Sequence, residues 1–270
     1  MYQRFAASPE QKQDDGNFSK SFGIAWHAME NLKFRASYAE GFMMPSAEQL
    51  AADFISFGRH YIGNADLKPE ESKTYEVGVD LDYQGLAASL TWFTTDFKNK
   101  IQPTSIGTTS SWINLGGATI SGMEADLSKS FDALGGGWIL SPYFNMVYLT
   151  EYEDDTTHER LLYTPEWNAT VGVRVHDQRG FSAMFNLSYV GETRIEDWET
   201  SWTPPIITKG GFTVANLSAS KKFLFDGDRQ NGRGLTVTGE VNNLFDRDYQ
   251  YVKGYPMPGR TFMVGLRVDI

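Results

Sequence analysis

Apolar and polar residues alternate with a period of two along most of the chain. The stretch FSAMFNLSY (181–189), for example, places its phenylalanines, leucine and tyrosine on one face and its serines and asparagine on the other. This alternation indicates β-strands with one apolar and one polar face. Eleven segments follow it, at residues 18–29, 31–41, 73–83, 86–97, 118–130, 137–150, 166–176, 180–190, 212–224, 234–246 and 259–270.

The connections between these segments alternate between short and long. Short ones include MEN, YQG, DALGGG and DQRG, with DGDRQNGRG somewhat longer. In an antiparallel sheet this order places every long connection at one end, which is typical of outer-membrane barrels with short periplasmic turns and long outside loops. A soluble β-sandwich or propeller is the alternative from pattern alone. The long connections are residues 42–72, 98–117, 151–165, 191–211 and 247–258.

The pattern therefore predicts an all-β protein. We expect an antiparallel transmembrane β-barrel portion of about 11 strands, formed by residues 1–270 as one domain. Within 73–83, Tyr75, Val77, Val79 and Leu81 are expected to face lipid, and Glu76, Asp80 and Asp82 are expected to face the lumen. Ser46 and Gln49 have capping-box spacing, which predicts a short loop helix with Leu50 and Phe54 packed inward.

Composition narrows the function classes. The chain has no cysteine, which excludes a disulfide scaffold and thiolate metal sites. Its formal net charge of −10 argues against a partner bound through phosphate contacts, so we expect no nucleic acid. No run of about 18 apolar residues exists, and the first residues lack a signal-peptide core. We therefore expect a mature chain, a fragment or a cytosolic protein.

Four blocks carry a resemblance to a known family. They are FRASYAEGFMMPSAEQL (34–50), GNADLKPEESKTYEVGVD (63–80), GGATISGMEADLSKSF (116–131) and VNNLFDRDYQYVKGYPMPGRTFMVGLRVDI (241–270). Together they resemble the C-terminal half of TonB-dependent outer-membrane receptors, which are 22-stranded barrels with an N-terminal plug. The resemblance implies a bacterial outer-membrane location, contact with lipid and lipopolysaccharide (LPS), and import of a ferric siderophore, haem or cobalamin-like ligand. It implies no enzymatic activity.

The chain also departs from this family pattern. It has no plug and no energy-coupling box, eleven strands are half of the family number, and it ends at Ile270 where the family usually ends in an aromatic residue. We therefore expect the plug domain and N-terminal barrel half to be supplied elsewhere, with the TonB complex reached through the plug. The expected function is part of an importer of an iron chelate (a ferric siderophore) or a related metal complex, in which this chain forms barrel wall and ligand-facing loops. The alternatives are a haem receptor of the same family, or a self-associated passive pore without active transport.

The long connections contain the candidate ligand-binding residues. Ferric siderophores and haem are usually anionic or aromatic, so cations beside aromatic rings would suit them. Haem receptors of this family carry an extracellular histidine between blocks like 42–45 and 63–67, where His60 lies, although both blocks are degenerate here. His60 is thus a haem-iron ligand only in the alternative. The candidates are Arg59, His60, Tyr61, Trp112, Arg194, Trp198 and Trp202.

Other chemistry has little support in the sequence. The four histidines show neither the Ser-His-Asp pattern nor metal-protease spacing, so no catalytic residue is expected. The acidic loops at 151–155 and 191–202 lack calcium-loop spacing, and solvated loop charge is the favoured interpretation over a cation site. The sequence predicts no cofactor and no metal site.

Overall fold

The computed structural model describes residues 18–132, 136–200, 203–225 and 233–269, most of them in β-strands. Its main sheet is antiparallel and twelve-stranded, and eleven of its strands follow one path in chain order. Short β10 (Phe131–Asp132) attaches beside β11. The path is β1 (Ser21–Met29), β2 (Leu32–Met43), β5 (Glu70–Tyr83), β6 (Leu86–Lys98), β9 (Gly117–Lys129), β11 (Trp138–Asp154), β12 (Trp167–Asp177), β13 (Phe181–Val190), β16 (Phe212–Leu224), β17 (Gly234–Asn242) and β18 (Thr261–Asp269).

The eleven predicted segments correspond one to one with these strands, and most ends agree within three residues. Two predictions of strand ends were wrong. Residues 151–154 continue β11 instead of starting a loop, because a bulge at Thr150 restores pairing between Glu151 and Ser121. Residues 243–246 are not strand, because Asn243 has a positive φ of 52° and its buried side chain holds the backbone of Arg247.

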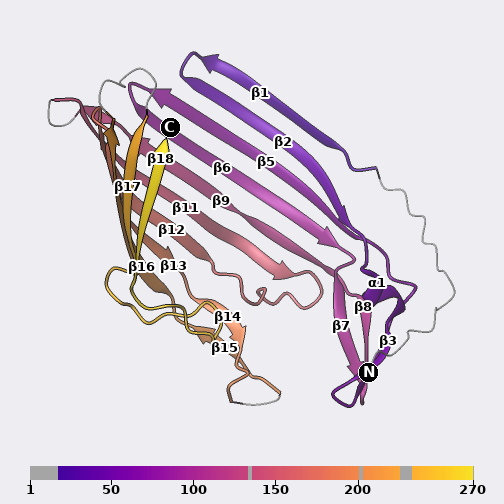
Figure 1. Ribbon diagram of the computed structural model, residues 1–270. Coiled ribbons are helices and arrows are strands. Elements are labelled where there is room, and N and C mark those ends of the chain that lie inside the picture. Colours follow the sequence, from indigo (N-terminus) through magenta and orange to yellow (C-terminus); the bar gives the residue numbers. More distant parts are fainter. Residues whose placement is uncertain (1–17, 133–135, 201–202, 226–232, 270) are drawn as a thin grey trace.

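The wall of long strands has short turns at one end and long connections at the other (Figure 1). Gln84 and Gly85 join β5 to β6, with φ of 49° and 78°. Positive φ at both central residues defines the type I′ turn, whose twist matches that of the flanking strands. This turn fixes the register in which Tyr83 lies opposite Leu86.

The two faces of the wall differ in chemistry, as the alternation predicts. On one face of β5, Tyr75 and Val77 are 44% and 51% exposed. On the other face, Asp80 forms ion pairs with Lys33 at 3.0 Å and with Arg35 at 3.3 Å. The largest fully buried side chains, Leu67 and Ile195, lie outside the long strands. The apolar face of the wall is therefore left uncovered by protein, as a surface that contacts lipid requires.

Strands β1 and β18 form the two edges of the sheet, and within the described residues neither pairs with the other. Nearly every residue of both strands is exposed. Figure 1 shows a curved wall, with strands β1, β2, β5, β6 and β9 seen face-on and β17 and β18 turned out of that plane. The described wall is thus an open portion of a barrel.

Three of the long connections, at 42–72, 98–117 and 191–211, contain short helical or strand elements, all at one end of the wall (Figure 1). The capping box at Ser46 and Gln49 is confirmed, and it starts a short helix, α1. Phe54 was expected to pack inward, but it lies in β3 with 37% exposure and stacks on Tyr61. No helix in the described ranges has the length and apolarity that a bilayer crossing needs. The elements are α1 (Ala47–Ala51), β3 (Asp53–Ser56), β4 (Arg59–Ile62), β7 (Ile101–Ile106), β8 (Thr109–Asn114), β14 (Thr193–Glu196) and β15 (Ile206–Lys209).

Candidate ligand-binding loops

Four of the predicted ligand-binding residues lie in one small sheet of order β3-β4-β8-β7. Arg59, His60 and Tyr61 belong to β4 and Trp112 to β8. The two strands pair in parallel, with Tyr61 opposite Ser110, which joins the first two long connections. The rings of Tyr61 and Trp112 lie 6.5 Å apart between centroids. The structure therefore brings together residues that are distant in the sequence.

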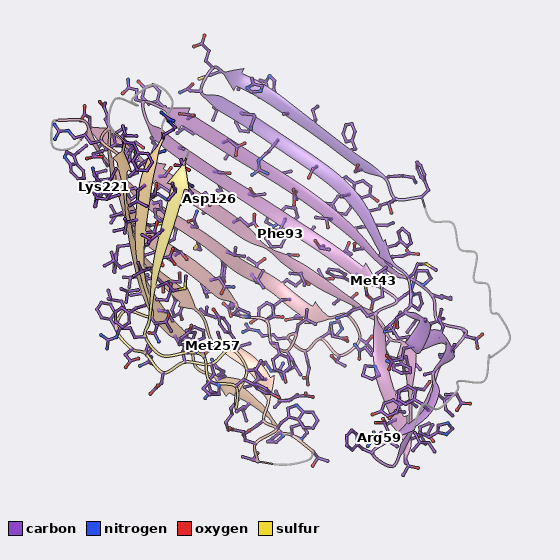
Figure 2. All side chains as sticks on the ribbon, viewed as in Figure 1. Met43, Arg59, Phe93, Asp126, Lys221 and Met257 are labelled. Carbon is purple, nitrogen blue, oxygen red and sulfur yellow. The ribbon has the colours of Figure 1, made fainter. Side chains whose placement is uncertain are left out.

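Arg59 and His60 each have local partners in this sheet. The Arg59 guanidinium donates to the hydroxyls of Ser105 and Ser110, at 3.0 and 3.2 Å. Figure 2 labels Arg59 at the far tip of the sheet, away from the wall. The Nε2 atom of His60 lies 2.7 Å from a carboxylate oxygen of Asp53. Arg59 keeps its positive charge without a carboxylate partner among the described residues, whereas His60 is already paired with one.

The remaining candidates lie on or beside the β14–β15 hairpin. Arg194 forms an ion pair with Glu159 at 3.0 Å. The indole of Trp198 is 58% exposed and donates to Glu196 at 3.1 Å. Trp202 lies outside the described residues. No hydrogen bond, ion pair or ring contact in the described ranges links this group to the β3-β4-β8-β7 sheet, so the predicted residues form two separate groups.

A third group of loop side chains was missed by the sequence analysis. Lys209, at the end of β15, lies 4.8 Å above the ring of Phe212. That ring contacts Tyr249 and Tyr251 at centroid distances of 4.9 and 5.2 Å. These side chains join the last two long connections. The alternation of Tyr249 and Tyr251 was a signal that the two rings share one side of their segment.

The loop that carries these tyrosines is held in place by polar contacts. The bridge between Gln250 and Pro256 closes its tip. Lys253 reaches Asp197 at 2.7 Å, and the side chain of Asp197 is only 6% exposed. The hydrogen bond from Lys253 holds the pKa of Asp197 below its ordinary value, and the same bond raises the pKa of Lys253. The two connections are thus tied by a charged pair at neutral pH.

The structure offers no grouping suited to a metal ion. Among residues 18–132, 136–200, 203–225 and 233–269, no three or more histidine, aspartate or glutamate side chains converge. The Asp154 carboxylate instead accepts from the backbone N–H groups of Thr156 and Thr157, both at 2.9 Å. The Asp154 side chain therefore stabilises a turn of the backbone.

Known proteins with similar sequences include two receptors. The chain is 23% identical over 254 residues to the ferrienterobactin receptor of Escherichia coli (strain K12). This match covers 86% of the present chain and 32% of the receptor. The chain is 24% identical over 283 residues to the ferric enterobactin receptor PirA of Pseudomonas aeruginosa, covering 93% and 36%. The chain thus spans about a third of the length of these relatives.

Solved structures show the same fold. The siderophore receptor PirA from Acinetobacter baumannii superposes with a TM-score of 0.72 at 20% identity, over 93% of this chain and 40% of that chain. The sequence pattern of the family described as TonB dependent receptor-like, β-barrel, matches residues 2–244. The chain therefore belongs to the TonB-dependent receptor β-barrel family of outer-membrane proteins, and the fold, location and non-enzymatic receptor class expected from its sequence are confirmed.

Proposed function

We propose that this chain forms barrel wall and ligand-facing loops of an importer for a ferric siderophore. The observation that carries the proposal is the gathering of cations and aromatic rings at the long-connection end, with Arg59 beside Tyr61 and Trp112 as the first group. The names of the two sequence relatives, both ferric enterobactin receptors, support the same ligand class. The plug domain, the N-terminal barrel half and the TonB complex complete the importer in this proposal.

The geometry supplies two of the properties that such an importer needs. Half-buried rings near a guanidinium without a carboxylate partner among the described residues attract an anionic, aromatic chelate to the outer end. The polar face of the wall, with Lys33, Arg35 and Asp80, keeps the lumen hydrophilic so that a charged ligand can pass. LPS and lipid contact the opposite, apolar face.

The test is uptake of radioactive iron as ferric enterobactin. The chain is expressed together with its plug and N-terminal barrel half in cells that lack their own siderophore receptors. We expect uptake that disappears when TonB is deleted and that falls in Arg59→Met. Lys129→Met, at the short-turn end, is the matched control and should leave uptake unchanged. Uptake without dependence on TonB, or ion conductance by the chain alone, would instead favour the passive pore.

Haem is the second candidate, because His60 has a suitable partner. Histidines that bind metals commonly donate their other ring N–H to a carboxylate. When Nε2 of His60 donates to Asp53, Nδ1 carries the lone pair that could take haem iron. Growth on haem as the sole iron source, lost in His60→Ala and kept in His158→Ala, would establish this alternative. Growth on ferric enterobactin alone would reject it.

A further inference from the structure

Lys209 is a partly buried cation without a counterion among the described residues. Its ammonium donates to the carbonyl of Gly210 at 3.3 Å, and it forms no ion pair with a carboxylate in the described ranges. Burial lowers the pKa of this ammonium, as the loss of water around a cation requires. Taking a charge out of water is costly unless another group compensates it. A negatively charged oxygen bound at this site would therefore stabilise the Lys209 ammonium.

Aromatic rings surround this ammonium. Its Nζ lies 4.8 Å from the centre of the Phe212 ring, within the range of a cation–π contact. Tyr249 packs on Phe212 with an interplanar angle of 40°, and Tyr251 meets Phe212 edge-on at 84°. Phe212 itself is only 6% exposed. The three rings make an apolar surface next to this ammonium.

Lys209, Phe212 and Tyr249 line a cavity of about 640 Å³ between β15 and the loop at 247–258. That volume lies in the range of sites that hold small ligands. Arg247 also lines the cavity, as does the carboxylate of Asp248, so that Lys209 and Arg247 place two cations beside one further carboxylate. Lys253 adds no free charge, because Asp197 and Glu199 lie 2.7 and 3.6 Å from it. Figure 2 places Met257, another lining residue, at the long-connection end of the wall.

We propose that this cavity is a subsite for an anionic aromatic group, such as one catecholate ring of an iron chelate. The ammonium of Lys209 takes the anionic oxygen, and the ring of Tyr249, which packs on the buried ring of Phe212, contacts the ring of the ligand. Arg247 at the cavity wall adds a second cation, so the lining keeps one net positive charge after the carboxylate of Asp248 is counted, which favours a negatively charged ligand. The inference deepens the proposed function and rests on it for the class of natural ligand.

The experiment measures binding of 2,3-dihydroxybenzoate to the purified protein in detergent by isothermal titration calorimetry. Acetate supplies a charge without a ring, and phenol a ring without a charge. We expect 2,3-dihydroxybenzoate to bind more tightly than either. Lys209→Met should weaken binding by about tenfold or more, because it removes a hydrogen bond to a charged group. Lys209→Arg, which keeps the cation, should retain most of the affinity.

Lys129→Met is the matched control, because Lys129 lies at the opposite end of the wall and contacts the carbonyl of Gln84. It should bind 2,3-dihydroxybenzoate as the unchanged protein does. Heat-modifiable migration on gels checks that every variant is folded. Equal binding by the unchanged protein and folded Lys209→Met would overturn the inference. So would a lack of binding by the unchanged protein, which would mean that another segment or chain covers the cavity.

Iron uptake separates this inference from the proposed function. Binding through Lys209 in a receptor that takes up no ferric enterobactin would leave the subsite standing and reject the importer. Uptake of ferric enterobactin, together with 2,3-dihydroxybenzoate binding that is unchanged in Lys209→Met, would support the importer and reject the subsite.

Discussion

Leu90 allows a direct test of which face of the wall contacts lipid. It is 48% exposed on the apolar face of β6, opposite Val79 and Ala125 in the neighbouring strands. Val79 lies midway along β5 between Tyr75 and Tyr83, whose rings are placed like the interfacial aromatic residues of a barrel. Leu90 should therefore lie near the middle of the bilayer, where Leu90→Arg places a charge in hydrocarbon.

The expected cost is about 2–4 kcal/mol for an arginine at the midplane. With a denaturant slope of about 2 kcal/mol per molar urea, a loss of about 3 kcal/mol lowers the unfolding midpoint by about 1.5 M. The assay is urea unfolding of the protein in lipid vesicles, followed by heat-modifiable migration on gels. The value is a difference between variants, so it does not depend on the absolute stability of the wall.

Ala87→Arg is the matched control on the same strand. Ala87 is exposed on the polar face and pairs with Asp82, so an arginine there meets water and a carboxylate. We expect its midpoint to change by less than about 0.5 M, since surface substitutions usually cost little. If Ala87→Arg costs as much as Leu90→Arg, the assignment of the two faces is wrong.

Two further predictions concern packing and pH. Gly172→Ala should lower the free energy of unfolding in urea by about 1–3 kcal/mol, because a Cβ there would lie 2.5 Å from the Tyr143 ring. Gly239→Ala, where a Cβ meets open space, is the control. Equal losses in the two variants would contradict the packing argument. The Asp197–Lys253 pair should stabilise its loops while the carboxylate is ionised. The pKa of Asp197 is lowered in the folded protein, so this stability is fully present above about pH 3.9, the ordinary aspartate pKa. It is lost as the pH falls through the lowered pKa of the folded state. Hydrogen exchange at the loop amides should show this acid loss in the unchanged protein but not in Lys253→Met, and identical profiles would refute it.

Much of the wall could be predicted from local sequence. A strand with one apolar and one polar face requires alternation, and turns such as Gln84–Gly85 give the positions where the chain reverses. The pattern failed where the backbone itself changed phase. At Thr150 the bulge shifts the alternation by one residue, so that β11 continues to Asp154 although the sequence suggests an acidic loop.

The candidate site was predicted less completely, because it depends on contacts between distant segments. Parallel pairing of Tyr61 with Ser110 has no local sequence signature, although the residues it gathers were chosen for their chemistry. Lys209 and Phe212 were overlooked since each looks ordinary in its own segment. Their significance comes from Tyr249, which lies far along the chain and meets them only in the folded structure.

The long strands pair in chain order, so the pairing within the wall does not depend on the sequence of the outer connections. Each long strand finds its partner in the next long strand of the sequence, and the register of each pair is set within the wall. Insertions or deletions in the outer connections therefore change no pairing in the sheet. Changes of sequence or length in those connections can therefore alter the surface at the outer end of the wall while the strand pairing of the wall stays the same.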